Sequence, residues 1–229
     1  MLMPLRRAIK PYLQPWQTED YRGIGVVYKR CLDGGGRTFG QEYLTFLRAH
    51  GAPRQKRVFE WCAGPAFIGF SLLANGLCET LCLADINPWA VEACRRTIRA
   101  SHLDDRVTIY HSDNLRSIPE SEKWDLVVGN PPHFVDERFG KLRAHDPDWS
   151  IHRAFYEQLP PHLAPNGLAL IQENNSGSTP QDFRAMIERN GLDLVYLSDH
   201  QPARAPGNKM YFMGSVRKGD RRPTWLPPA

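Results

Sequence analysis

Short apolar runs alternate with helix-like patterns between residues 57 and 217 of this 229-residue chain. Runs of this kind, only a few residues long, are typical of strands buried in a sheet. They are "RVFEW" (57–61), "TLCLADI" (80–86), "RVTIYH" (106–111), "WDLVVGN" (124–130), "GLALIQEN" (167–174), "LDLVYLSDH" (192–200) and "KMYFMGSVR" (209–217). The pattern therefore predicts seven strands.

Helix-like patterns separate most of these strands. The predicted helices cover residues 66–76, 87–102, about 149–163, and a segment that opens at Thr179. Asn87 is suited to cap the second of them, because Pro88 follows in the first helical position. Thr179 stands three residues before Asp182, the spacing of a capping box.

Alternation of strands and helices predicts a mostly parallel sheet, because parallel strands need crossover helices. The last two runs are joined by "QPARAPGN" (201–208), a link too short for such a crossover. We therefore expect an α/β fold with a Rossmann-like seven-stranded, mostly parallel sheet, its last strand antiparallel and helices on both faces. This domain is assigned to residues 56–218.

The ends of the chain lack this pattern. Residues 1–55 read as an irregular lead-in with one helix near 40–50, and residues 219–229 read as a flexible tail. The lead-in contains "GGGRTFGQEY", residues 34–43. Two interpretations of that segment stay open, a lid over a bound ligand and a plain surface loop.

Composition narrows the class of protein only slightly. Charged residues make up 24% and hydrophobic residues 41%, and the net charge of +4 permits a nucleic-acid partner without requiring one. The five cysteines form no CxxC pair and are expected as free thiols in a reducing compartment. No run is long and apolar enough to cross a membrane, and the first fifteen residues have no apolar core of a secretory signal. We therefore expect a cytoplasmic protein.

Candidate chemistry lies where the predicted strands end, since open α/β sheets bind ligands there. The small-residue turn in "EWCAGPAF" (60–67) can bring backbone and a helix N-terminus close to a ligand. Asp85, which follows Gly64 by 21 residues, can accept hydrogen bonds from both hydroxyls of a ribose. Asp113 and Asn114 end the third strand, where they are suited to read an adenine edge. The fourth strand ends in "NPPH", Asn130 to His133.

A glycine turn followed by an acidic residue is also typical of nicotinamide-dependent enzymes, which is the alternative interpretation. That fingerprint requires three glycines, whereas only Gly64 is in register here, flanked by Cys62 and Ala66. Four successive strand ends with suitable polar groups are more specific than any one of them.

Over residues 56–217 the sequence resembles class I S-adenosylmethionine-dependent methyltransferases, and among them those with an Asn-Pro-Pro-aromatic motif. These include HemK-like glutamine methyltransferases of release factors and the adenine-N6 and guanine-N2 methyltransferases of nucleic acids. The resemblance implies S-adenosylmethionine as cofactor and no metal. It assigns Glu60, Cys62 and Gly64 to the cofactor loop, Asp85 to the ribose, Asp113 to the adenine, and Asn130, Pro131 and Pro132 to the catalytic loop.

Such a loop suits a nitrogen whose lone pair is delocalised. The Asn130 side-chain oxygen and the Pro131 carbonyl can each accept one N–H, which directs the lone pair at the methyl group and favours the developing positive charge. Prolines restrict φ and have no N–H that would compete for these acceptors. We therefore expect methyl transfer to a planar nitrogen.

His133 departs from the motif, which usually has Tyr, Phe or Trp at this position. An imidazole stacks over a smaller area, and it can also form hydrogen bonds or carry charge. Phe134 follows directly and can supply the missing ring. The departure leaves the enzyme class in place but weakens any transfer of substrate from the family.

The expected acceptor is a protein glutamine amide, narrowly ahead of an exocyclic amine of RNA or DNA; a small molecule is the third alternative. A non-catalytic binding module with this fold is the alternative from another class, and the presence of Asn130 speaks against it. The remaining histidines show no metal spacing, and residues 145–152 are placed near the substrate mouth.

Overall fold

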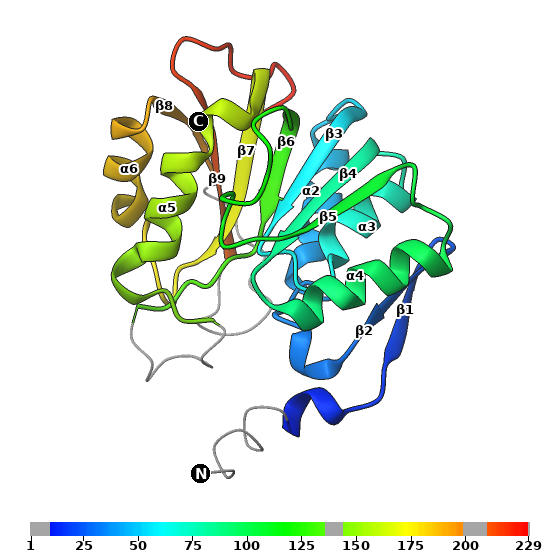
Figure 1. Cartoon of the computed structure of the whole chain (residues 1–229). Helices are drawn as coiled ribbons and strands as arrows, with labels where there is room; N and C mark the ends of the chain where they lie inside the picture. Colours follow the sequence, from blue (N-terminus) through cyan, green and yellow to red (C-terminus); the bar gives the residue numbers. More distant parts are fainter. Residues whose placement is uncertain (1–9, 136–143, 199–209, 229) are drawn as a thin grey trace.

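Seven strands form one sheet in the order β5-β4-β3-β6-β7-β9-β8. In this computed structural model, residues 10–135, 144–198 and 210–228 are described (Figure 1). Only β9 runs antiparallel to its neighbours, which confirms the predicted fold class. The strands are β3 (Gln55–Trp61), β4 (Cys78–Asp85), β5 (Val107–His111), β6 (Trp124–Gly129), β7 (Leu163–Asn174), β8 (Leu192–Leu197) and β9 (Met210–Arg217).

Helices cover both faces of the sheet because alternate strand residues point to opposite sides. Val58 and Leu81 belong to a core cluster with α2, α3 and α4, whereas the neighbouring residues Phe59 and Cys82 belong to a cluster with α5 and α6. The helices are α2 (Glu42–Ala49), α3 (Phe67–Ala74), α4 (Pro88–Ala100), α5 (Ser150–Gln158) and α6 (Pro180–Arg189).

Most predicted helix boundaries agree with the structure. The Asn87 side chain accepts a hydrogen bond from the Trp89 N–H, and the predicted capping box of Thr179 and Asp182 is present. The helix expected over 149–163 is shorter than predicted: α5 stops at Gln158, and a 3-10 turn follows over Pro160–His162. Two successive prolines explain the break, since proline cannot continue an α-helix from within.

The lead-in is more regular than the sequence suggested. A hairpin of β1 (Gln17–Tyr21) and β2 (Ile24–Tyr28) packs on α3 and α4, after a 3-10 turn over Lys10–Leu13. Its two-residue loop, Arg22-Gly23, has positive φ at both positions, as hairpin turns of type I′ require. That dipeptide was the available signal for the hairpin. The predicted helix near 40–50 is present as α2.

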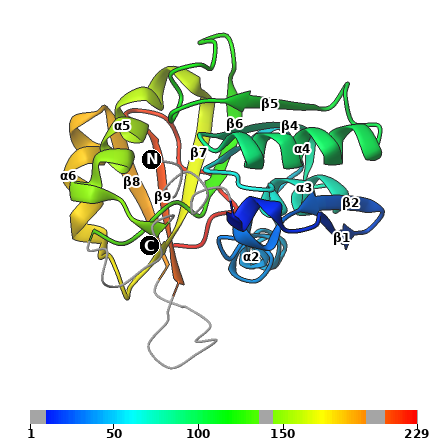
Figure 2. The same ribbon diagram turned by 60° about the horizontal axis from the view of Figure 1, so that its bottom comes forward.

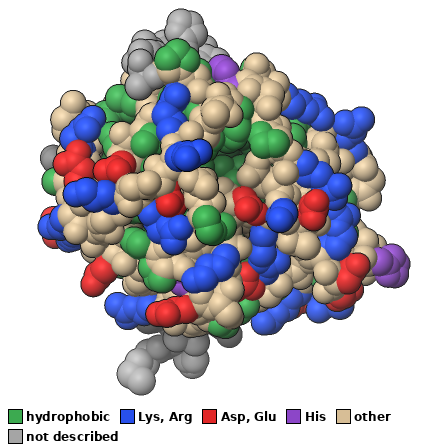
Figure 3. Space-filling view, turned by 90° about the horizontal axis from the view of Figure 1, so that it is seen from above, with side chains coloured by type: hydrophobic (Ala, Val, Ile, Leu, Met, Phe, Trp, Pro, Cys, Tyr) green, Lys and Arg blue, Asp and Glu red, His purple; other side chains and the backbone are tan. Residues whose placement is uncertain are grey.

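The C-terminal residues also differ from the flexible tail expected from the sequence. Leu226 is buried in the core, and the Arg222 guanidinium donates to the Val195 carbonyl. This end of the molecule is opposite the carboxyl ends of the parallel strands, and there Lys and Arg side chains are interspersed with Asp and Glu (Figure 3).

The predicted loop 201–208 lies outside the described residues. Within the described ranges, no helix has the length and apolar character needed to cross a membrane.

Candidate active site

A cavity of about 460 Å³ lies at the carboxyl ends of the central parallel strands. Figure 2 turns this end of the sheet forward, with the hairpin and α2 beside it. Every candidate site residue predicted from the sequence lines this cavity. They are Glu60, Cys62, Gly64, Asp85, Asp113, Asn114, Asn130, Pro131, Pro132 and His133. The fold thus brings the predicted cofactor and catalytic residues together, although their individual roles stay predictions.

The turn after β3 has the backbone shape of a glycine-rich loop with only one glycine in register. Cys62, Gly64 and Ala66 have φ values of 51°, 54° and 63°, all in the left-handed region. This region costs a residue with a side chain about 1–2 kcal/mol, so tertiary contacts must hold the turn. At Gly64 an added Cβ would lie 3.3 Å from the Leu32 carbonyl oxygen, a tight contact. Absence of the flanking glycines therefore does not prevent the turn.

Glu60 is buried beneath this turn and stabilises the start of α3. Its Oε2 accepts a hydrogen bond from the Gly69 N–H at 2.6 Å. The N-cap residue Ala66 has no side-chain acceptor, so the Glu60 carboxyl supplies one for the orphan amides of the first turn. Burial raises the pKa of Glu60 to about 8, although hydrogen bonds from Gly69 and Ile68 oppose the rise. Glu60 thus supports the turn and the start of α3 by hydrogen bonds to backbone.

Asp85 is held by backbone on both carboxylate oxygens. Oδ2 accepts from the Gly64 N–H and Oδ1 from the Asn87 N–H, each at 2.7 Å. Burial raises the pKa of Asp85, and these two hydrogen bonds oppose that rise. Each oxygen keeps a further lone pair. The carboxylate is therefore fixed in place and still able to accept the two hydroxyls of a ribose.

Asn114 is oriented by the indole of Trp61, at the end of β3. The Trp61 Nε1–H donates to Asn114 Oδ1 at 3.0 Å, and Asn114 Nδ2 donates to Asp113 Oδ1 at 3.4 Å, which leaves one amide N–H for another partner. Asp113 is exposed, and its carboxylate lies 3.8 Å from the Arg116 guanidinium. Of the two residues predicted to read the adenine, Asn114 is thus the one with the more rigid environment.

Asn130 lines the cavity and has an unsatisfied acceptor in its side chain. Its Oδ1 is buried and has no hydrogen-bond partner among the described residues, while its Nδ2 lies 3.5 Å from the Gly34 carbonyl oxygen. A buried oxygen without a donor is costly, so such a group calls for an explanation. An N–H of a bound molecule would satisfy it.

His133 has its ring held by the preceding loop. Its Nδ1 lies 3.1 Å from the Pro131 carbonyl oxygen, and since a carbonyl only accepts, Nδ1 carries the proton. Burial lowers the pKa of His133 to about 4, despite this hydrogen bond, so the ring is neutral near pH 7. The Pro131 carbonyl therefore already has one donor, and one lone pair remains for a substrate.

The lead-in also contributes to the cavity wall, whereas the sequence left open whether residues 34–43 form a lid or a plain surface loop. Its lining residues are Tyr12, Cys31, Leu32, Gly34 and Gly36. The glycine triplet was the only signal there, because close approach of backbone needs small residues. The segment therefore forms part of the wall beside Asn130.

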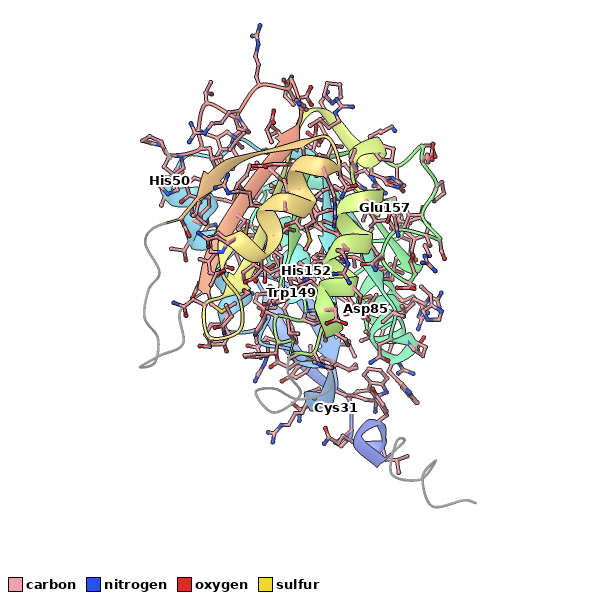
Figure 4. The ribbon with its side chains drawn as sticks, turned by 90° about the vertical axis from the view of Figure 1, so that its left-hand side faces the viewer. Cys31, His50, Asp85, Trp149, His152 and Glu157 are labelled. Atoms are coloured by element: carbon pink, nitrogen blue, oxygen red, sulfur yellow. The ribbon has the colours of Figure 1, made fainter. Side chains whose placement is uncertain are left out.

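A buried charged cluster lies behind the acceptor loop. The sequence placed residues 145–152 near the substrate mouth but did not indicate that two of them pair with Glu173. His152 contacts the carboxylates of Asp146 and Glu173, and Figure 4 shows it next to Trp149 near the start of α5. Burial disfavours the charged ring, but the two carboxylates outweigh it and raise the pKa of His152 to about 9. Burial also raises the pKa of Glu173, against the opposing charge of His152.

Comparison with known proteins covers most of the chain. Residues 25–189 match the family model described as "Methyltransferase small domain". The release factor glutamine methyltransferase of Clostridium acetobutylicum is 36% identical over 89 residues, which are 38% of this chain and 31% of that protein. The same enzyme of Aquifex aeolicus is 23% identical over 126 residues, 50% of this chain and 44% of that protein. The chain thus spans less than half the length of these relatives.

Solved structures share the fold at low sequence identity. TYW2 from M. jannaschii, in complex with AdoMet, superposes with a TM-score of 0.58 at 16% identity, covering 89% of this chain and 87% of that one. A TehB-like SAM-dependent methyltransferase from Corynebacterium glutamicum has a TM-score of 0.54 at 18% identity, covering 82% and 94%.

Proposed function

The chain belongs to the methyltransferase small domain family and is an S-adenosylmethionine-dependent methyltransferase, and from that premise we propose that its acceptor is a planar nitrogen. This family assignment agrees with the resemblance seen in the sequence and removes the nicotinamide and non-catalytic alternatives. A protein glutamine side-chain amide is our first candidate for the acceptor.

The observation that carries the proposal is the buried, unpaired Oδ1 of Asn130. An amide or aromatic amine has two N–H groups, of which Asn130 Oδ1 can accept one and the free lone pair of the Pro131 carbonyl the other. Both acceptors become more favourable as positive charge develops on the nitrogen. No separate strong base is needed, because the nitrogen loses its proton readily once it carries the methyl group.

The residues along β3 and β4 suit the methyl donor. Asp85 offers two fixed acceptors for ribose hydroxyls, and the left-handed turn at Gly64 allows close approach of backbone. S-adenosylmethionine, when bound, supplies an electrophilic methyl group on sulfur. The shared cavity lets Asn130 present the acceptor nitrogen to that group.

The relatives support glutamine as the acceptor, since several carry the name release factor glutamine methyltransferase. An exocyclic amine of RNA or DNA is the second candidate, favoured by the net charge of +4. A small molecule is the third, because His133 replaces the usual large aromatic ring. We also propose a cytoplasmic location, which the five free cysteines support.

Transfer of a labelled methyl group tests the proposal. The protein is incubated with methyl-labelled S-adenosylmethionine and an extract of its source cells, and the mixture is passed through a size filter. We expect retained label that protease releases and nuclease does not. Release by nuclease would select the nucleic-acid acceptor, and label in a small product other than the donor would overturn the glutamine assignment.

A further inference from the structure

We propose that His152 is a positioning residue for methyl transfer: held between Asp146 and Glu173, it secures residues 144–146 against residues 133–134 and thereby fixes the Asn130–His133 loop. The inference rests on the proposed function of that loop. It concerns groups that do not line the cavity themselves and so cannot contact the reacting atoms.

The three side chains form a closed cluster of charge inside the protein. His152, Asp146 and Glu173 each have 0% exposure. His152 Nδ1 lies 2.6 Å from Asp146 Oδ2, and Nε2 lies 2.9 Å from Glu173 Oε1. Because a carboxylate only accepts, each ring nitrogen must carry a proton to make both contacts, so the ring bridges as an imidazolium.

Burying such a cluster costs free energy, so packing alone does not explain why it is there. Buried ion pairs lose more hydration than an apolar replacement would, and they are weak evidence of a contribution to stability. Here one oxygen, Glu173 Oε2, also lacks a hydrogen-bond partner among the described residues. What an ion pair offers in exchange is defined geometry, since its members tolerate little displacement.

The cluster connects directly to the acceptor loop through backbone hydrogen bonds. The Asp146 N–H donates to the Phe134 carbonyl at 2.8 Å, and the Phe134 N–H donates to the Ala144 carbonyl at 2.9 Å. The His133 N–H reaches the same Ala144 carbonyl at 3.1 Å. Displacement of Asp146 would therefore move the backbone on which His133 and the preceding prolines are held.

The same carboxylate fixes the turn into α5. Asp146 Oδ1 accepts from the Ile151 N–H at 2.8 Å and Oδ2 from the His152 N–H at 3.1 Å. Between Asp146 and Ile151, the residues Asp148 and Trp149 both have left-handed φ values, 53° and 56°. Two successive non-glycine residues in that region are strained, and such strain persists only where surrounding contacts impose it.

Trp61 joins this cluster to the cofactor side. Its indole packs edge-on against the His152 ring with centroids 5.1 Å apart, and its Nε1–H donates to Asn114. A change at His152 thus has one route to the acceptor loop through hydrogen bonds and another, through van der Waals contact, to the cofactor pocket. The hydrogen-bonded route is the stiffer one, so we expect the acceptor side to respond more.

The test replaces His152 with glutamine and uses His162→Gln as a matched control. His162 is also buried, stacks on Trp124 with centroids 4.8 Å apart, and hydrogen-bonds the Glu122 carbonyl. It precedes β7 and so lies at the end of the sheet opposite the cavity. Both variants lose a buried, hydrogen-bonded imidazole, but only one loses contact with the acceptor loop.

Three quantities are measured: the turnover with the acceptor found in the label-transfer experiment, the affinity for S-adenosylhomocysteine, and amide hydrogen exchange at Phe134 and Asp146. For His152→Gln we expect turnover to fall about 10- to 100-fold, as for a misplacement on the ångström scale. The S-adenosylhomocysteine affinity should stay within about threefold, and the two amides should exchange at least about tenfold faster. His162→Gln should leave all three close to the wild-type values.

Equal losses of turnover in folded His152→Gln and His162→Gln, or unchanged exchange at Phe134 and Asp146, would overturn the proposal. Hydrogen exchange needs no methyl acceptor, so it tests whether His152 holds residues 144–146 against residues 133–134 even if the wild type methylates nothing. Absence of methylation by the wild type would refute the proposed function instead. If His152→Gln does not fold, Glu173→Gln serves in its place. That variant keeps an acceptor for His152 Nε2, and we expect a smaller loss of turnover with the same unchanged affinity for S-adenosylhomocysteine.

Discussion

The β3–β5 half of the site and the β6–β7 half differ in how the hydrogen bonds of their buried polar groups are satisfied. In the first, Glu60 and Asp85 are satisfied by backbone N–H groups, those of the first turn of α3 and of the turns after β3 and β4. In the second, Asn130 Oδ1 and Glu173 Oε2 have no partner among the described residues, and His152 pairs with the side chains of Asp146 and Glu173.

This difference suggests which half is complete by itself. A pocket built from backbone amides needs only the local turns, and it suits a ligand that all members of a family share. The other half keeps an open acceptor and depends on a charged cluster behind it. Such a surface can be changed side chain by side chain to fit a different methyl acceptor without disturbing the first half.

Asn130→Ala should impair methyl transfer and leave cofactor binding intact. Removal of the buried oxygen takes away a group that stabilises charge on the acceptor nitrogen, so we expect turnover to fall about 10²- to 10³-fold. The affinity for S-adenosylhomocysteine, measured by calorimetry, should change little, because Asp85 is untouched. Near-normal turnover in this variant would show that the proposed mechanism is wrong.

The charged cluster should make stability depend on pH. The pKa of His152 is raised from 6.5 to about 9 in the folded protein, so the folded state binds this proton more tightly than the unfolded state. The contribution, on the order of 3 kcal/mol, is present below pH 6.5 and is lost as pH rises through 9. Urea denaturation should show the advantage of wild type over His152→Gln shrinking across that range.

Other titrating groups must be separated from this effect. Asp146 and Glu173 face His152 directly, Asp182 acts on Glu173, and the neutral His133 lies within electrostatic reach. The comparison between wild type and variant cancels distant groups such as Glu60, whose pKa of about 8 also makes stability fall as pH rises. An advantage over His152→Gln that stays constant from pH 6 to 10 would contradict the assigned charge of His152.

Asp85→Ala should produce the opposite pattern to Asn130→Ala. Loss of the carboxylate removes charge-assisted hydrogen bonds to the ribose that are worth about 1.5–3 kcal/mol in total, and we expect the affinity for S-adenosylhomocysteine to fall about 10- to 100-fold. Turnover at saturating S-adenosylmethionine should fall much less. If both variants lowered affinity and turnover alike, the two halves would not be separable.

His133→Tyr should have the smallest effect. The imidazole is neutral and its Nδ1 proton is engaged by Pro131, so it offers the acceptor molecule mainly a ring face. We expect turnover within about threefold of wild type, since stacking is retained. Collapse of activity would show that the free Nε2 forms a necessary hydrogen bond with the acceptor, and the dependence of turnover on pH would then identify that group.

The cofactor half could be predicted closely from the sequence because its residues stand at the carboxyl ends of parallel strands. Glu60, Gly64 and Asp85 lie at the ends of two adjacent strands, and the apolar runs placed those ends correctly. The capping residues Asn87 and Thr179 likewise act within one helical turn. Strand periodicity and turn chemistry are short-range properties, so they can be read along the chain.

Tertiary structure decided what distant segments supply. The hairpin over residues 17–28 contributes to the core, the carbonyl of Gly34 reaches the side chain of Asn130, and the Tyr43 hydroxyl lies 2.7 Å from the carbonyl oxygens of Gly129 and Leu170. None of these contacts has a spacing that a sequence pattern could reveal.

The charged cluster shows the same limit most clearly. The sequence by itself determined the sheet, its reversed last strand and the residues at its carboxyl edge, because periodicity and chain connectivity impose them. Only the folded structure placed Glu173 of β7 against His152 of α5 and Asp146 before it. Long-range pairing of charges depends on how elements pack, and packing is a property of the whole chain.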